Sequence, residues 1–209
     1  MFTIEELIEN TTTRSILEKA EELFLARGFS YVEMKDIAAE SGVARSTLYR
    51  YFPSKEALAF YVSLYLFHAR PMVYHGPLPQ GSGYEKLEFS LKKTIELLSL
   101  RRAEMAYFTQ FDLIFSGAYP DMDVSDYYEK HLKEHRPAFL DLIEAGMADG
   151  SIRALDNPKL AAFSLQNALI AMAQRVLPRE EHLRREQGYG IELLHNMTEQ
   201  MLAYYKNVK

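Results

Sequence analysis

The chain has 209 residues and a formal net charge of −5, and it contains no cysteine. A chain of this length can bury a sizeable hydrophobic core, and without cysteine it can form neither a disulfide nor a thiolate metal site. The acidic balance argues against strong sequence-independent binding to nucleic acid, because phosphate contacts supply most of that affinity. Binding to DNA would therefore depend on a local cluster of basic residues.

The N-terminus and the hydropathy pattern bear on localisation. The chain begins MFTIEELIEN, which is acidic where a secretory signal peptide is basic. We find no apolar run that approaches the roughly 20 residues that a membrane-spanning helix needs. We therefore expect a cytoplasmic protein that does not cross a membrane.

Apolar residues recur at helical spacing along the chain, and no alternating strand pattern of useful length occurs. Gly28 and Gly42 end two of these patterns, and the segment 73–83 is the clearest loop. Helices are expected at about 13–27, 34–41, 44–52, 55–70, 84–98, 105–115, 124–149 with an interruption at Pro137, 157–176, and after Pro178 with a start obscured by Gly188 and Gly190. Residues 1–11 are expected to be an acidic lead-in with at most a frayed turn. An all-α protein of about nine helices follows.

The stretch 34–52, MKDIAAESGVARSTLYRYF, has the pattern of a helix-turn-helix. Ala38, Gly42 and Leu48 fall where this motif needs a small contact residue, a turn glycine and an inward apolar anchor. The outward side of the second helix carries polar and basic side chains: Arg45, Ser46, Thr47, Tyr49 and Arg50. Since the segment 44–58 holds three basic residues and one acidic residue, it has the local positive charge that DNA phosphates attract.

The flanks of this stretch extend the pattern. From Thr12 to Leu58 the chain reads TTRSILEKAEELFLARGFSYVEMKDIAAESGVARSTLYRYFPSKEAL. This segment resembles the DNA-binding domain of the TetR family of bacterial transcriptional regulators, through its first helix ILEKAEELFLARGF, the turn DIAAESGV, the recognition helix STLYRYF and the helix start PSKEAL. The sequence MADGSIR at 147–153 is a weaker echo of the family.

The resemblance implies an N-terminal three-helix DNA-binding domain at 1–54 and a helical ligand-binding and dimerisation domain at 55–209. It implies a transcription regulator, a repressor in the simplest case, that binds a palindromic operator on double-stranded DNA as a homodimer. A small apolar or aromatic effector would release it. Neither a cofactor nor a metal is expected. The chain has no Gly-rich phosphate loop or nucleophile elbow, so we do not expect an enzyme.

Roles in DNA binding follow from side-chain chemistry and from the resemblance. Arg45 and Arg50 are expected at base edges or nearby phosphates, because a guanidinium binds guanine O6 and N7 bidentately. Thr47 can offer its hydroxyl and methyl groups to a base or a phosphate. The resemblance suggests phosphate contacts for four further residues: Thr13, Lys35, Tyr49 and Lys55. For Lys35, an ordinary solvated position is an equally good interpretation.

Two positions depart from the family pattern. Where the family usually has serine at the start of the recognition helix, this chain has Ala44. Where it often has threonine or serine before the preceding helix, this chain has Val32 and Glu33. An alanine at an N-cap forfeits about 1 kcal/mol, so a weak cap is expected at Ala44.

Aromatic and methionine side chains beyond residue 100 are candidates for a ligand pocket, because they give large and adaptable contact area. They are Met105, Tyr107, Phe108, Phe111, Phe115, Phe139, Phe163, Gln166 and Met172. An aromatic stripe at helical spacing is more often plain core, and each residue is open to that interpretation. Gln166 is a polar side chain in an apolar helix and is equally suited to face a dimer partner.

The last two helices are expected to form a four-helix bundle with their copies in a second subunit. The candidate interface residues are Ala161, Ala168, Ala171, Leu194, Met197, Met201 and Tyr205. Two-fold symmetry then requires two recognition helices about one DNA turn, roughly 34 Å, or a near multiple of it, apart.

Other interpretations stay open at this stage. One is a DNA-binding regulator without a small-molecule effector, and another is a helical binding protein with a vestigial DNA-binding domain. Activation rather than repression depends on operator position and not on this chain. His131 and His135 are four residues apart with Glu134 beside them, a spacing that suits a metal ion, although the dense charge of this segment favours a solvated helix.

Overall fold

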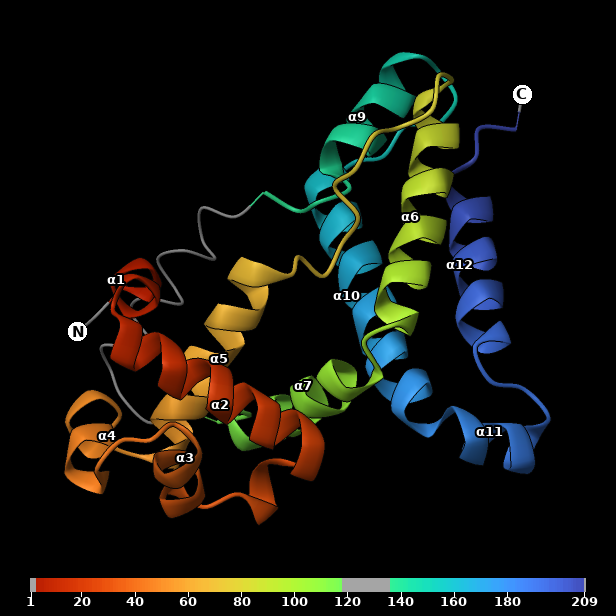
Figure 1. Ribbon diagram of the computed structural model, residues 1–209. Helices are drawn as coiled ribbons and strands as arrows, with labels where there is room; N and C mark the ends of the chain where they lie inside the picture. Colours follow the sequence, from red (N-terminus) through yellow and green to blue (C-terminus); the bar gives the residue numbers. More distant parts are fainter. Residues whose placement is uncertain (1–2, 118–135, 209) are drawn as a thin grey trace. The chain divides into compact units, whose positions relative to one another are not determined.

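The computed structural model describes residues 3–117 and 136–208, which form α-helices, short 3-10 helices and one isolated β-bridge (Figure 1). The all-α class is therefore confirmed. Contacts divide the described residues into two compact units. The first comprises the described parts of Met1–Arg70 and Ala106–Glu134, and the second those of Pro71–Met105 and His135–Lys209. The expected boundary after residue 54 differs from this division, because the next helix packs within the first unit.

The first unit is built around the contact between its two long helices. It contains α1 (Ile4–Glu9), α2 (Thr11–Arg27), the 3-10 turn η1 (Phe29–Tyr31), α3 (Met34–Glu40), α4 (Arg45–Tyr51), α5 (Lys55–Ala69) and the later part of α7 (Arg102–Ile114). Helix α2 packs against α1, α3 and α5, and α3 packs against α4. The four helices expected between residues 13 and 70 are confirmed with small changes at their ends.

The core of this unit lies between α2 and α5. Side chains of both helices are fully buried, among them Ile16, Leu17, Leu58, Phe60 and Val62. Glu21 lies on the α5 side of α2 and forms an ion pair with Arg70 at the end of α5. Glu21 is only 9% exposed, although a carboxylate is usually found on the solvent side of an amphipathic helix. The charge is tolerated there because it is paired.

Helix α1 is a complete short helix rather than a frayed turn. Thr3 caps it in a capping box, in which its hydroxyl accepts from the backbone N–H of Glu6 and the Glu6 carboxylate accepts from the Thr3 N–H. Ile4 and Leu7 are buried. Asn10 then caps α2 by accepting from the N–H groups of Thr12 and Thr13, so the chain turns directly from one helix into the next.

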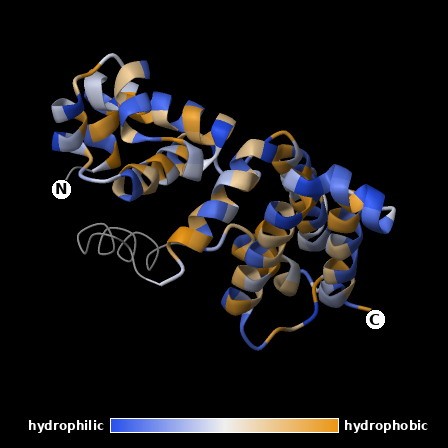
Figure 2. Ribbon diagram, turned by 90° about the horizontal axis from the view of Figure 1, so that it is seen from below, coloured by the Kyte–Doolittle hydropathy of each residue, from blue (hydrophilic) through white to orange (hydrophobic). Residues whose placement is uncertain are grey.

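The second unit is a bundle of four main helices. It contains α6 (Gly83–Ser99), α9 (Leu140–Ala148), α10 (Pro158–Val176), η2 (Leu177–Arg179), α11 (Glu180–Gln187), α12 (Glu192–Tyr205) and the first turn of α7. Helix α6 packs against α9 and α12, and α10 packs against all three of these helices. In Figure 2 the helices alternate hydrophobic and hydrophilic residues along their length, as amphipathic helices do when they bury one side.

The sequence expectations for this unit are mostly confirmed. Asn157 caps α10 and Pro158 is its first residue, and α10 ends at Val176 as expected. The helix expected after Pro178 is two helices in the structure. Gly188, whose backbone is left-handed (φ 80°), ends α11, and α12 follows. Only the end of the expected helix 124–149 is described, as α9, which begins after Pro137. His131, Glu134 and His135 lie outside the described residues.

One described helical stretch, Pro158–Gln187, is long and apolar enough by length and composition to cross a membrane. The expectation that no apolar run approaches that length is therefore corrected. The α10 part of this stretch packs against α6, α9 and α12, which are the contacts of a core helix in a bundle.

Helices α6 and α9 approach each other at a pair of glycines. A Cβ atom added at Gly83 would overlap the backbone nitrogen and Cα of Gly146. The turn after α9 caps α6 at the same place: the N–H of Gly83 donates to Asp149 Oδ2 at 2.7 Å, and the N–H of Tyr84 donates to Ser151 Oγ at 3.0 Å. Glycine at 83 is thus required by backbone contact between the two helices.

We expect Gly83→Ala to lower the free energy of unfolding by about 1–3 kcal/mol, the usual cost of overpacking, because backbone atoms of α9 must move. Thermal or urea unfolding followed by circular dichroism measures this. Gly117→Ala is the matched control, since a Cβ there meets nothing within 4 Å. Equal stability of the two variants would contradict the close packing.

Candidate nucleic-acid interface

Helices α3 and α4 form the helix-turn-helix expected from the sequence. The turn passes through Gly42, whose φ of 70° is left-handed, and the N–H of Val43 donates to the carbonyl of Ala38 at 3.0 Å. Ala38 and Leu48 are buried, with exposed fractions of 3% and 0%. The small contact residue, the turn glycine and the apolar anchor therefore occupy the expected places.

Burial of Leu48 leaves the opposite side of α4 facing solvent. Four of the expected DNA-contacting residues on this side are exposed: Arg45, Ser46, Tyr49 and Arg50. The fifth, Thr47, is half-buried. The Arg50 guanidinium lies 4.9 Å from the centre of the Tyr51 ring, and its Nη2 donates to the Tyr51 hydroxyl at 3.4 Å. This aromatic contact orients an otherwise exposed arginine.

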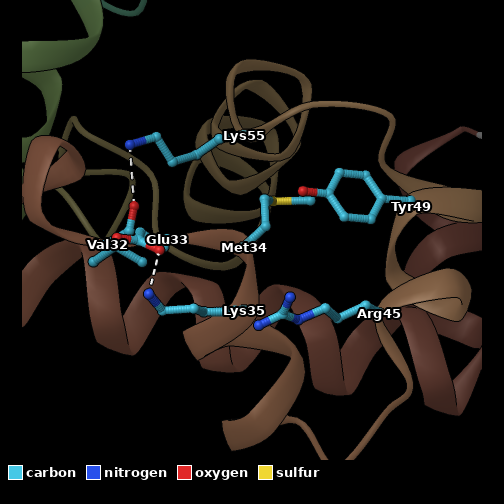
Figure 3. A pocket seen from close by; sticks show the side chains of 7 residues that line it. All are labelled: Val32, Glu33, Met34, Lys35, Arg45, Tyr49 and Lys55. Carbon is cyan, nitrogen blue, oxygen red and sulfur yellow. Dashed lines mark hydrogen bonds and ion pairs between the residues drawn. The ribbon is translucent and has the colours of Figure 1, made fainter.

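A surface hollow of about 330 Å³ lies between the start of α3, the outward side of α4 and the start of α5 (Figure 3). It is lined by Val32, Glu33, Met34, Lys35, Arg45, Tyr49 and Lys55. In Figure 3, the Arg45 guanidinium extends toward the base of the Lys35 side chain, while the Lys35 ammonium points away from Arg45 to Glu33. The hydroxyl end of Tyr49 points toward Met34. Three cationic side chains and a phenol thus surround this hollow, which we call the cationic hollow. The arrangement can offer several hydrogen bonds to an anion such as a phosphate.

Lys55 has a structural role within this group. Its Nζ donates to the carbonyls of Phe29 and Val32, both at 3.0 Å, and lies 4.3 Å from the centre of the Phe29 ring. An ammonium group has three hydrogens to donate, so these carbonyls leave at most one for DNA. The expected phosphate contact of Lys55 is therefore secondary to holding η1 against α5.

Lys35 is tied to a neighbouring acid. Its Nζ lies 2.6 Å from Glu33 Oε2, and both side chains are more than half exposed. The hydrogen bond from Glu33 raises the pKa of Lys35, so the lysine stays charged. The carboxylate partly cancels that charge at the hollow, which weakens the case for Lys35 as a phosphate ligand.

The structure does not support the expected phosphate contact of Thr13. Thr13 is 1% exposed, and its hydroxyl donates to the carbonyls of Leu7 at 2.5 Å and Asn10 at 3.1 Å. Helix α1, which the sequence pattern did not predict, covers this position. The threonine stabilises the turn between α1 and α2 instead.

The two departures from the family pattern have different outcomes. At the start of α3, Asp36 Oδ2 accepts from the N–H of Glu33 at 3.0 Å, so a carboxylate caps this helix in place of a hydroxyl group. At the start of α4, Ala44 is the N-cap, with φ −66° and ψ 146°, and it has no side chain that can cap. The recognition helix therefore begins without a side-chain cap.

The candidate pocket residues of the first unit lie together. Phe60 of α5 contacts the rings of Phe111 and Phe115, and Phe108 stacks on Phe67 at 4.9 Å. These residues form the aromatic cluster: Phe60, Phe67, Tyr107, Phe108, Phe111 and Phe115. The Tyr107 hydroxyl donates to the carbonyl of Ala59 at 2.5 Å, and burial raises the pKa of Tyr107, so the phenol stays protonated.

The other candidate pocket residues belong to the second unit. Met105 and Phe139 are fully buried, whereas Phe163, Gln166 and Met172 on α10 are half-buried. Gln166 Oε1 accepts from the N–H of Ala138 at 3.1 Å. That amide oxygen therefore caps the segment before α9.

The candidate dimer residues divide by exposure. Leu194 and Tyr205 are 0% and 5% exposed, and the Tyr205 hydroxyl donates to the carbonyl of Ala161 at 3.1 Å, so both side chains pack within the protomer. This corrects their expected place in an interface between subunits. Ala171 is exposed, and the remaining candidates are half-buried: Ala161, Ala168, Met197 and Met201. Within the described residues, no group of three or more histidine or acidic side chains is arranged to hold a metal ion.

Known proteins match the chain most clearly in the first unit. The model of the family "Bacterial regulatory proteins, tetR family" matches residues 16–62. A protein of Mycobacterium tuberculosis named as mycofactocin biosynthesis transcriptional regulator MftR is 49% identical over 49 residues, which cover 23% of this chain and 25% of that protein. The HTH-type transcriptional repressor KstR2 of Mycolicibacterium smegmatis is 28% identical over 142 residues, 66% of each chain. The matches thus span a quarter to two thirds of these relatives.

Solved structures resemble the whole fold at low sequence identity. A tetR-family regulatory protein from Rhodococcus RHA1 has a TM-score of 0.63 and 18% identity, over 96% of this chain and 100% of that one. A protein from Saccharomonospora viridis described as a transcriptional regulator, in complex with choline, has a TM-score of 0.62 and 20% identity, over 94% of this chain and 97% of that one. At this identity the resemblance concerns the fold.

We expect Ala44→Ser to raise the free energy of unfolding by about 1 kcal/mol, because a serine hydroxyl at the N-cap can accept an N–H of the first turn of α4. The midpoint of thermal unfolding reports the change. Ala39→Ser, at an exposed position in the last turn of α3, is the control and should be neutral or slightly destabilising. An unchanged or lower midpoint for Ala44→Ser would show that position 44 does not limit the helix start.

Proposed function

We propose that the chain is a member of the tetR family of bacterial regulatory proteins, which residues 16–62 match, and that it is a cytoplasmic transcription repressor, not an enzyme, that a small molecule releases from its operator. In this proposal residues 1–54 bind double-stranded DNA, and the rest of the chain binds the effector and a second copy of the chain. One observation carries the DNA-binding part: the helix-turn-helix presents the exposed Arg45, Tyr49 and Arg50 on the side opposite the buried Leu48.

The expected readout of DNA combines base and phosphate contacts. Arg50 is suited to the major groove, because its guanidinium is already oriented by Tyr51 and can reach a guanine edge bidentately. Arg45 and Tyr49 line the cationic hollow and are suited to adjacent phosphates. Ser46 and Thr47 lie on the same helix and add polar groups.

Two DNA-binding units are needed because the cations are few. A chain with net charge −5 gains little from its overall charge near DNA. Joining two copies lets both bind one palindromic site, and the second contact then forms at high effective concentration. The proposed interface is the solvent-facing side of α10, which carries Leu160 (61% exposed) and Ala171, with Met197 and Met201 of α12 beside it.

The aromatic cluster is the proposed site of response to an apolar or aromatic effector. Helix α5 supplies Phe60 and Phe67 to the cluster, and its first residue Lys55 lines the hollow near the recognition helix. A ligand that contacts the cluster can shift DNA affinity only as far as it binds two positions of α5 and α7 with different affinity. The choline complex of the S. viridis protein supports the idea that this fold accommodates small molecules.

We expect Arg50→Ala to weaken binding to a duplex selected from a random library by the wild-type protein. Loss of a bidentate base contact costs about 1–3 kcal/mol per site, or roughly 5- to 150-fold in Kd for each contact, and specificity at one base pair should relax. Fluorescence anisotropy at fixed salt measures Kd. Arg185→Ala, on the exposed side of α11, is the control with the same charge change. If the two variants bind equally well, α4 does not read the DNA.

We expect Ala171→Glu to convert the dimer to a monomer, because two-fold symmetry would bring the new carboxylates together in an apolar interface. Ala171 is exposed in the protomer, so the substitution should leave the fold intact. Light scattering after size-exclusion chromatography gives the mass. Ala103→Glu, exposed in the first turn of α7, is the control. A dimeric Ala171→Glu variant would place the interface elsewhere.

A further inference from the structure

A single amide side chain of α7 holds the turn that leads into the helix-turn-helix. Gln110 Oε1 accepts from the backbone N–H of Phe29 at 2.9 Å. The amide group lies against Gly28, where an added Cβ would be 3.4 Å from Oε1 and 3.5 Å from Nε2. Gly28 also has a φ of 82°, which disfavours any larger residue. The glycine therefore both turns the chain after α2 and admits the glutamine.

The same turn is held from its other side by α5. Lys55 Nζ donates hydrogen bonds to the carbonyls of Phe29 and Val32. Phe29 thus has its N–H bound by α7 and its carbonyl bound by α5. Val32 lies two residues before α3 and lines the cationic hollow together with Arg45 and Tyr49. A displacement of the η1 backbone would therefore change the start of α3 and the shape of the hollow.

Helix α7 also contacts this turn through its rings. One turn before Gln110, the Tyr107 ring stacks on Phe24 at 6.1 Å, and Phe24 contacts the Phe29 ring at 5.6 Å. The residue after Gln110, Phe111, belongs to the aromatic cluster and lies 6.4 Å from Phe60. Neighbouring side chains of one rigid helix thus contact both the proposed effector-responsive cluster and the backbone before α3.

We infer that Gln110 is a positioning residue that couples the position of α7 to the DNA-binding surface through the N–H of Phe29. The inference rests on the proposed function. A shift or rotation of α7 that accommodates a ligand among the cluster rings carries Gln110 with it, and a bond of 2.9 Å weakens steeply as its length and angle change. Loss of this bond frees η1 and makes the hollow less ordered. Coupling between two sites is reciprocal, so binding of DNA must also change the conformational freedom of α7.

Three variants separate this role from simple packing. Gln110→Leu keeps most of the side-chain volume and removes the acceptor. Gln110→Glu keeps an oxygen at the end of the same stem, which can still accept from the Phe29 N–H. Leu113→Ala is the control, since Leu113 lies on the same helix and is 76% exposed. DNA affinity is measured by anisotropy on the duplex selected by the wild-type protein, and backbone amide hydrogen exchange is followed over 28–36 and 106–114 with and without that duplex.

We expect Gln110→Leu to raise Kd about 3- to 10-fold, which corresponds to about 0.7–1.4 kcal/mol and lies within the range for one hydrogen bond. Exchange in 28–36 should rise. In the wild-type protein, DNA should slow exchange in 106–114, and Gln110→Leu should abolish that slowing. Gln110→Glu should restore affinity and slowing to within about twofold of wild type, and Leu113→Ala should match wild type.

Several results would overturn the inference. If Gln110→Leu changes exchange in 28–36 but neither DNA affinity nor the DNA-dependent slowing at 106–114, the bond is only structural. If Gln110→Glu behaves as Gln110→Leu, the acceptor is not the cause. A wild-type protein that selects no DNA at all would instead refute the proposed function, and the inference with it, whereas tight DNA binding by both wild type and Gln110→Leu refutes the inference alone.

Discussion

The proposed DNA-binding surface depends on one interaction with the backbone, the hydrogen bonds from the Lys55 ammonium to the carbonyls of Phe29 and Val32. Backbone carbonyls that lose water must find donors, and a charged donor satisfies two of them at once. The first residue of α5 is thereby joined to the segment that leads into α3. The start of α3, the outward side of α4 and the start of α5 then enclose one cationic hollow.

This arrangement suits a chain whose overall charge is unfavourable for DNA. With few cations available, their placement matters more than their number, and the fold uses side chains and backbone to restrict them. Tyr51 orients Arg50 before any ligand binds, whereas Lys55 is held chiefly as a support of the η1 backbone, through the Phe29 carbonyl and ring. Restricting side chains before binding reduces the entropy lost on binding, which partly compensates for weak general attraction. The same restriction makes the surface sensitive to the backbone that carries it.

Sequence patterns predicted most helices because their ends carry strong local signals. Asn157 and Pro158 mark the start of α10, and Gly42 marks the turn between α3 and α4. Site residues were predicted less evenly. Exposed residues of α4 followed from helical periodicity, but Thr13 did not, because its burial depends on α1, a short helix with one weak apolar pair. Gln110 gave no signal, since a lone glutamine on a helix is ordinary until its partner 81 residues away is known.

The sequence by itself determined the all-α class, the similarity of its N-terminal part to the tetR family and the outward side of α4, because capping residues, helical periodicity and the motif from Thr12 to Leu58 are local properties of the chain. The tertiary structure alone decided which polar side chains form hydrogen bonds with the protein's own backbone. Thr13, Lys55 and Gln110 look alike as solvent-facing polar residues in the sequence, yet Thr13 bonds to a backbone carbonyl of α1, and Lys55 and Gln110 bond to backbone atoms of Phe29 in η1. The physical reason is that a side chain's partners are set by packing of distant segments, which no local pattern records.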